Sequence, residues 1–144
     1  MRPTIDKRIL AGLNATFIEG ETMITETAKH QLNEYFSAER INFDVPLLMV
    51  GSSFQKTVWN ELLKIPYGQT ESYLGLSRKI GNEKAIRSVA AANGANAISI
   101  LVPCHRIIGS DGRMTGYGGG LQAKRKLLQL EMRKQSSDQL TLFI

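Results

Sequence analysis

Apolar residues in the first fifty positions follow a helical period in one stretch only. This stretch predicts a helix over about residues 24–38, because its apolar side chains recur every three or four positions: Ile24, Ala28, Leu32, Tyr35 and Phe36. Residues 1–22 show no firm period, and the pattern leaves room there for one or two short strands. Residues 1–50 are therefore interpreted as a short N-terminal α/β segment.

Gly51 marks a boundary, after which the pattern becomes more regular. Ser52 and Gln55 stand three positions apart and predict a capping box at the start of a helix. Pro66 and Gly68 end this helix, whose apolar side chains fall on one face. That face carries Phe54, Val58, Trp59, Leu62 and Leu63.

Two short helices come next and form a helix-turn-helix pattern. The first is predicted over about residues 73–80 and closes at Gly81. The second opens at Asn82, a residue type suited to an N-cap, runs to about Asn93 and closes at Gly94. The face of this second helix that is predicted to be buried carries Ile86, Val89 and Ala90. Another face presents Lys84, Arg87 and Ala91. The layout suits DNA binding, but many helix pairs without that function share it.

The apolar run Ile98–Val102 predicts a short buried strand, and Pro103 ends it directly before Cys104. Residues 109–120 are rich in glycine and are predicted to form a loop.

A final helix is predicted from about Leu121 past Glu131. Its inward positions are Leu127 and Leu128, and the positions in or near solvent are Lys124, Arg125 and Lys126. Residues 135–144 follow as a tail, so that the second domain spans residues 51–134.

Composition and charge favour a soluble protein with a basic second half. Hydrophobic residues make up 42% of the 144 positions, enough for a core, and no apolar run is long enough to cross a membrane. Residues 1–50 carry a net charge of −2, whereas residues 51–144 carry +7. This division is typical of a protein that binds a polyanion such as nucleic acid, although solubility alone would also explain it. The N-terminus does not resemble a signal peptide, so a cytoplasmic protein without membrane contact is expected.

Cys104 is the only cysteine, which excludes an internal disulfide. His30 and His105 are the only histidines, so a metal site is not expected, and His30 is interpreted as a surface residue. A thiol reacts as its thiolate, and His105 can take the proton directly or through a water. Glu131 is available to orient that imidazole. The alternative is that Cys104 is an inert packing residue, the commoner role of a lone cysteine after an apolar strand.

Four segments carry a resemblance to a known family: FQKTVWNELLKIPYGQTESY, AIRSVAAANGAN, ILVPCHRIIGSDGRMTGYGGG and KRKLLQLE. Through them, residues 54–131 resemble the C-terminal domain of the O6-alkylguanine-DNA alkyltransferases, also called methylated-DNA–protein-cysteine methyltransferases. The Pro-Cys-His-Arg block is the most specific part. The segment QLNEYFSAERINFDVPL is similar to the end of that family's N-terminal domain. Full-length relatives have a larger N-terminal domain, so residues 1–50 are interpreted as an abbreviated version.

The resemblance implies a mostly helical α/β fold with a winged-helix-like helix-turn-helix domain. It implies DNA repair by irreversible, single-turnover transfer of an alkyl group from O6-alkylguanine, with O4-alkylthymine as a further candidate substrate. The nucleotide is first flipped out of the duplex. Cys104 would accept the alkyl group, and His105 would lower the pKa of the thiol through a bridging water. Glu131 would orient His105, and Asn96 would help to hold the segment of Cys104.

The resemblance also implies contacts with the minor groove of double-stranded DNA. Tyr73 would crowd the phosphate of the target nucleotide, and Arg87 would fill the space that the base leaves. Tyr117 would donate to the guanine, and the amide of Gly118 would face the guanine oxygen. Three positions match residues that touch the DNA backbone: Gln55, Asn82 and Ser110. No cofactor is expected, because the lesion itself is the alkyl donor, and the protein is expected to be a monomer.

Three other functions are alternatives to alkyl transfer. Alkyltransferase-like proteins bind the lesion without transfer, but they lack the acceptor cysteine that Cys104 supplies here. A cysteine hydrolase needs a histidine that reaches the thiol from elsewhere in the fold, and His30 is the only one available. A transcription factor that reads sequence leaves the Pro-Cys-His-Arg block unexplained. Alkyl transfer is therefore the prediction, and lesion binding without transfer is the alternative.

Overall fold

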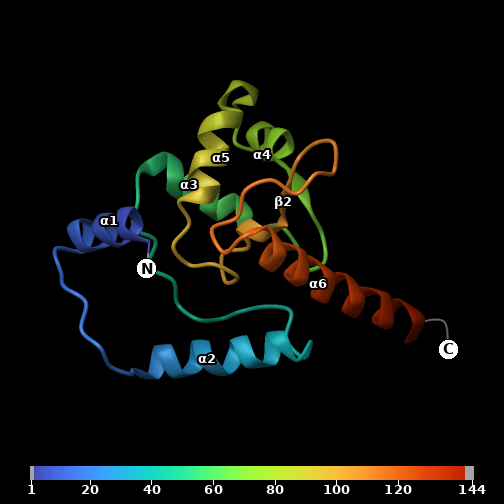
Figure 1. Ribbon diagram of the computed structural model, residues 1–144, viewed down its shortest axis with the longest axis horizontal. Coiled ribbons are helices and arrows are strands. Elements are labelled where there is room, and N and C mark those ends of the chain that lie inside the picture. The colour runs from blue at the N-terminus through green and yellow to red at the C-terminus, as the bar shows by residue number, and fades with distance from the viewer. Residues whose placement is uncertain (1, 142–144) are drawn as a thin grey trace.

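The computed structural model describes residues 2–141, with side chains described through residue 136. Within that part it has six α-helices, two 3-10 turns and one small sheet (Figure 1). The helices are α1 (Pro3–Leu13), α2 (Met23–Phe36), α3 (Ser53–Leu62), α4 (Tyr73–Lys79), α5 (Ile86–Gly94) and α6 (Leu121–Thr141). The 3-10 turns are η1 (Glu83–Ala85) and η2 (Cys104–Arg106), and the strands are β1 (Glu71–Ser72) and β2 (Ile107–Ile108). The predicted fold class, mostly helical α/β, is confirmed.

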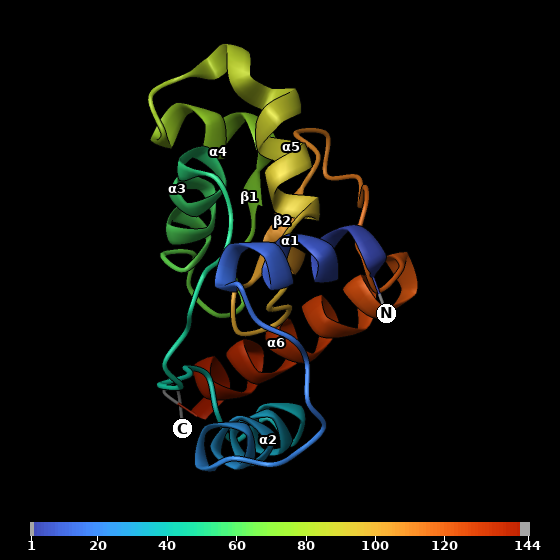
Figure 2. The same ribbon diagram turned by 90° about the vertical axis from the view of Figure 1, so that its left-hand side faces the viewer.

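Helices α4 and α5 lie side by side at one end of the molecule, and α3 packs against α5 (Figures 1 and 2). Helix α2 lies at the opposite end, and Figure 2 shows α6 between it and the helix-turn-helix. Strands β1 and β2 pair in parallel, with Glu71 opposite Ile107 and Ser72 opposite Ile108. Because β1 directly precedes α4 and β2 directly follows η2, this pairing joins the helix-turn-helix to the turn that carries Cys104.

The start of α3 confirms the predicted capping box. The backbone amide of Gln55 donates to the Ser52 hydroxyl at 3.1 Å, and the Ser52 amide donates to Gln55 Oε1 at 3.0 Å. The buried face of α3 is narrower than predicted, since Phe54 and Leu63 at its edges are 36% and 44% exposed. Its buried residues are Val58, Trp59 and Leu62, which belong to the main hydrophobic core.

The expectation of strands within residues 1–22 is wrong, because this region forms helix α1. Pro3 stands in the first turn, where its missing N–H costs no hydrogen bond, and Asn14 ends the helix in the left-handed conformation. The period was present but short: the side chains that α1 turns toward the domain are spaced four apart, at Ile5, Ile9 and Leu13. Three positions are too few to distinguish a helical period from a chance spacing of apolar residues.

The second helix of the helix-turn-helix begins later than predicted and buries a different face. Asn82 makes no side-chain cap, and the 3-10 turn η1 precedes α5. A 3-10 helix has three residues per turn, whereas an α-helix has 3.6. The turn η1 therefore changes which side chains of α5 face the interior. Ile86 and Ala90 are exposed, contrary to the prediction, and the buried residues are Val89, Ala92 and Asn93. The exposed positions of Lys84, Arg87 and Ala91 agree with the prediction.

The predicted strand Ile98–Val102 is also wrong, since this run forms a tight turn with one isolated bridge between Ser99 and Val102. The side chain of Asn96 explains the difference. Its Nδ2 donates to Val102 O at 2.9 Å and its Oδ1 accepts from Ile98 N at 2.9 Å. These bonds satisfy the backbone locally and so compete with a strand ladder.

Helix α6 continues through Thr141, so the predicted tail at 135–144 is helical as far as that residue. Residues 142–144 lie outside the described part of the chain. In the part that is described, no helix combines the length and the apolar character needed to cross a membrane.

Candidate active site

Cys104 opens the turn η2 and is only 5% exposed, within the hydrophobic core. Asn96 Nδ2 donates to Cys104 Sγ at 3.1 Å. Burial raises the pKa of the Cys104 thiol, and the hydrogen bond from Asn96 offsets only part of that rise. Cys104 therefore needs a base to react, and the lowering of its pKa by His105 through a water stays a prediction.

A fully buried carboxylate, Glu131, collects hydrogen bonds from four other residues. His105 Nε2 lies 2.7 Å from Glu131 Oε1, and Arg106 donates to both carboxylate oxygens at 3.0 and 3.1 Å. The Tyr35 hydroxyl donates to Oε1 at 2.7 Å, and the Gly68 amide donates to Oε2 at 3.1 Å. The structure thus brings His105 and Glu131 together as expected, and it adds three partners that the motif did not indicate.

These bonds determine the charge of the carboxylate and the tautomer of the imidazole. Burial alone would raise the pKa of Glu131, but the hydrogen bonds from His105 and Arg106 outweigh it and lower that pKa to about 2. An ionised carboxylate only accepts, so a neutral His105 carries its proton on Nε2. The other ring nitrogen, Nδ1, is buried and has no hydrogen-bond partner among the described residues. Nδ1 therefore keeps its hydrogen-bonding capacity free, in the residue that follows Cys104 in the sequence.

A surface pocket between α5 and the loop before α6 contains four of the predicted DNA-contacting residues: Tyr73, Arg87, Tyr117 and Gly118. The Tyr73 hydroxyl donates to Thr115 O at 3.2 Å and so ties α4 to that loop. Burial, and then the neighbouring Cys104, raise the pKa of Tyr117, so its hydroxyl stays protonated at neutral pH. The pocket therefore combines an exposed cation with a phenolic hydrogen-bond donor.

Arg2 lines the same pocket, although no sequence pattern singled it out. Its Nη1 donates to Asn96 O at 3.0 Å, and its Nη2 donates to Gly94 O. A Cβ added at Gly118 would lie 2.8 Å from Arg2 Cζ, so the missing side chain at Gly118 leaves room for the guanidinium. Arg2 and this loop are far apart in the chain, and no local motif could have signalled the contact.

Lys124 is fully buried, which contradicts its predicted position in or near solvent. Its Nζ donates to Thr115 O at 2.9 Å and to Gly116 O at 3.4 Å, so it holds the loop that carries Tyr117. Burial lowers the pKa of Lys124, and the neighbouring Cys104 acts in the opposite direction. A signal was present, because Lys124 shares the spacing of three, four and seven residues with the inward-facing Leu127, Leu128 and Glu131.

The remaining predicted residues lie apart from this pocket. Gln55 is half-buried, and its side chain is engaged in the cap of α3. Asn82 and Ser110 are exposed in the turn before η1 and in the loop after β2. His30 is also exposed and contacts Glu34 on α2.

Fold and site together define a helix-turn-helix protein with one buried cysteine, which accepts a hydrogen bond from Asn96 and precedes a histidine held by Glu131. Residues 53–133 match the family model described as "6-O-methylguanine DNA methyltransferase, DNA binding domain". The methylated-DNA–protein-cysteine methyltransferase of Mycobacterium tuberculosis is 53% identical over 116 residues, 81% of this chain and 70% of that relative. The protein of the same name from Methanosarcina acetivorans is 49% identical over 116 residues, 81% of this chain and 74% of the relative.

The crystal structure of Mycobacterium tuberculosis OGT in complex with DNA aligns with a TM-score of 0.75 and 51% identity. That alignment covers 76% of this chain and 68% of the other. The chain therefore belongs to the family of methylated-DNA–protein-cysteine methyltransferases.

Proposed function

We propose that this protein repairs DNA by moving an alkyl group from the O6 atom of guanine onto Cys104, once per molecule. The observation that carries the proposal is the placement of the only cysteine. It receives a hydrogen bond from Asn96 and directly precedes His105, whose Nε2 is held by the buried carboxylate of Glu131. A packing cysteine has no need of this arrangement, whereas a nucleophile does.

The chemistry is an in-line displacement at the alkyl carbon. A bond forms between Cys104 Sγ and that carbon while the bond from the carbon to guanine O6 breaks, and the electron pair leaves with the guanine. His105 Nδ1 takes the thiol proton, directly or through a water, and Glu131 stabilises the resulting imidazolium. The Tyr117 hydroxyl donates to the departing guanine. The thioether that remains is stable, so the reaction ends after one turnover and requires no cofactor.

DNA engagement uses the exposed face of α5. Ala90, Ala91 and Ser88 are small and exposed beside Arg87, so the helix can approach the minor groove closely. Arg87 enters the gap left by the flipped base, Tyr73 crowds the adjacent phosphate, and the amide of Gly118 faces the guanine oxygen. The DNA backbone is contacted by Gln55, Asn82 and Ser110. We propose that the protein does this as a monomer in the cytoplasm.

Incubation with duplex DNA that carries O6-methylguanine tests the proposal directly. The intact mass of the protein is expected to rise by one methylene unit, with the modification mapped to Cys104 and never more than one per chain. The matched control is the same duplex with unmodified guanine, which should leave the mass unchanged. A protein that binds the lesion but keeps its mass would support lesion binding without transfer and refute the proposal.

Replacing Arg87 by alanine should slow transfer from duplex DNA selectively. Without the guanidinium the flipped state loses the group that fills its gap, so the rate is expected to fall about tenfold or more. Reaction with the free O6-alkylguanine base, which needs no flipping, should stay within about twofold of the original. The matched control is Lys84→Ala, which removes an exposed cation from the same region without touching the pocket. Equal losses on duplex and free base would contradict the role of Arg87.

A further inference from the structure

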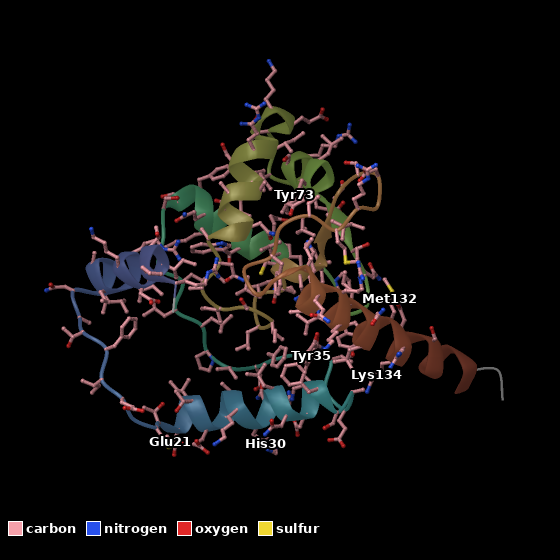
Figure 3. All side chains as sticks on the ribbon, in the orientation of Figure 1. Glu21, His30, Tyr35, Tyr73, Met132 and Lys134 are labelled. Carbon is pink, nitrogen blue, oxygen red and sulfur yellow. The ribbon has the colours of Figure 1, made fainter. Side chains whose placement is uncertain are left out.

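Tyr35 is the largest fully buried side chain among the described residues, and it comes from the N-terminal segment. It lies on α2, well outside residues 53–133, which match the family's DNA-binding domain. Figure 3 shows its side chain between α2 and α6, whereas His30 on the same helix points away from the domain. Its hydroxyl reaches Glu131 on α6 and donates to Oε1 at 2.7 Å.

The oxygen that Tyr35 contacts is the one that holds His105. Glu131 Oε1 receives the Tyr35 hydroxyl and His105 Nε2, each at 2.7 Å, and Arg106 Nη2 at 3.1 Å. The Arg106 guanidinium binds both oxygens of the Glu131 carboxylate. Without a further partner, Arg106 would determine the orientation of that carboxylate. The phenol adds a fixed, short bond on Oε1 and thereby helps to set where that oxygen meets the imidazole.

Tyr35 is itself held rigidly. Its ring packs against those of Phe36, Phe43 and Tyr67, with centroids 5.4, 5.5 and 6.0 Å away. Lys134 Nζ on α6 also donates to Ala38 O, just after the end of α2. This bond is a second connection between the two parts of the chain, besides that of Tyr35 with Glu131. Burial, and then the Glu131 carboxylate, raise the pKa of Tyr35, so the hydroxyl remains a proton donor.

We propose that Tyr35 is a positioning residue for alkyl transfer, acting through the Glu131 oxygen that orients His105. The N-terminal segment then helps to position the residues that accept the thiol proton, and does more than cover the domain. This inference rests on the proposed function, because it assigns Tyr35 to the same reaction. Tyr35 touches neither the thiol nor the substrate pocket among the described contacts, so its effect passes entirely through Glu131 and His105.

The test is Tyr35→Phe, which removes one oxygen and keeps the ring. Two rates are measured on the full chain: methyl transfer from saturating O6-methylguanine duplex, and alkylation of the only thiol by iodoacetamide near neutral pH. Both are expected to fall about tenfold, the effect of losing one hydrogen bond to a charged group, while DNA affinity is unchanged. Iodoacetamide needs no DNA, so the second rate reports on the relay alone.

The matched control is Phe43→Leu, which loosens the packing around the Tyr35 ring without touching its hydroxyl. It should lower the urea midpoint of unfolding while both rates, measured on folded protein, stay within about twofold of the original. Rates for Tyr35→Phe within that same range would overturn the inference, and so would equal losses in Phe43→Leu. If the original protein fails to transfer methyl groups but iodoacetamide still separates the variants, the proposed function fails and the positioning of His105 by Tyr35 stands.

Discussion

Replacing Cys104 by alanine is expected to abolish alkyl transfer and to leave DNA binding intact. Cys104 is the only thiol in the chain, so no second cysteine can take over. The nearest buried amine, Lys124, is engaged by the carbonyls of Thr115 and Gly116 and its Nζ is not free to attack. The side chains proposed to contact the flipped nucleotide, Tyr73, Arg87 and Tyr117, lie on α4, α5 and the loop before α6, and no described hydrogen bond joins them to the sulfur atom.

Two quantities are measured: alkyl transfer from O6-methylguanine duplex, and affinity for the same duplex by fluorescence anisotropy. The salt concentration is kept the same throughout, because affinity for DNA depends strongly on salt. Affinity should stay within about threefold of the original, since the lost group is buried and small. Cys104→Ser is the matched variant: it keeps a polar atom near Asn96 but offers a hydroxyl in place of a thiol, and it should also fail to transfer. Transfer above background in Cys104→Ala would show that another residue is the acceptor, and transfer in Cys104→Ser would show that the site does not require a thiol.

Replacing Glu131 by alanine is expected to lower the free energy of unfolding by about 3–5 kcal/mol, the cost of breaking a buried ion pair by removing one partner. Arg106 is 6% exposed and its guanidinium would lose its counter-charge, and the Tyr35 hydroxyl would lose its acceptor. Transfer should fall as well, because His105 loses the group that orients it. Urea unfolding of both proteins measures the difference in stability.

The same variant should change the response to acid. The Glu131 pKa is about 2 in the folded protein against an ordinary value of 4.5. A depressed carboxylate stabilises the fold fully above its ordinary pKa, and that contribution disappears as the pH falls from about 4.5 toward 2. Stability of the original protein should therefore drop through this range more steeply than that of Glu131→Ala, in which the group is absent.

The control for both measurements is Glu83→Ala on η1. Glu83 forms an ion pair with Arg78, but both side chains are largely exposed, at 61% and 59%. Its removal should change stability by no more than about 0.5 kcal/mol and should leave the acid response unchanged. A Glu131→Ala variant that behaved like this control would show that the buried carboxylate does not hold the domain together.

Features with a long or specific signal could be predicted from sequence. The helix around Ile24–Tyr35, the cap at Ser52 and the pairing of His105 with Glu131 all followed from periodicity, spacing or the Pro-Cys-His-Arg block. The family assignment followed from that block and its neighbours, and the match over residues 53–133 confirms it.

What could not be predicted depends on individual side-chain hydrogen bonds, within one turn or between distant parts of the chain, that the hydrophobic pattern does not encode. The apolar run Ile98–Val102 predicted a strand, but the side chain of Asn96 bonds to its backbone and stabilises a turn instead. Lys124 was predicted to lie in or near solvent because lysines usually do, although its spacing placed it on the inward face of α6. The loop carbonyls that accept from its Nζ account for its burial. The sequence placed Tyr35 on the apolar face of a helix, and no local pattern indicates that its hydroxyl donates to the Glu131 carboxylate on α6.

The two-residue pairing of β1 with β2 also limits where this chain can change in length. A residue inserted between β1 and α4, or between η2 and β2, would displace Tyr73 relative to Cys104 by about 3.3 Å and turn the following side chains to the opposite face. The loop at residues 110–113 is exposed and lies outside both strands, so it can lengthen at little cost to the fold. Insertions and deletions across homologous chains should therefore gather in that loop and be rare on either side of the sheet.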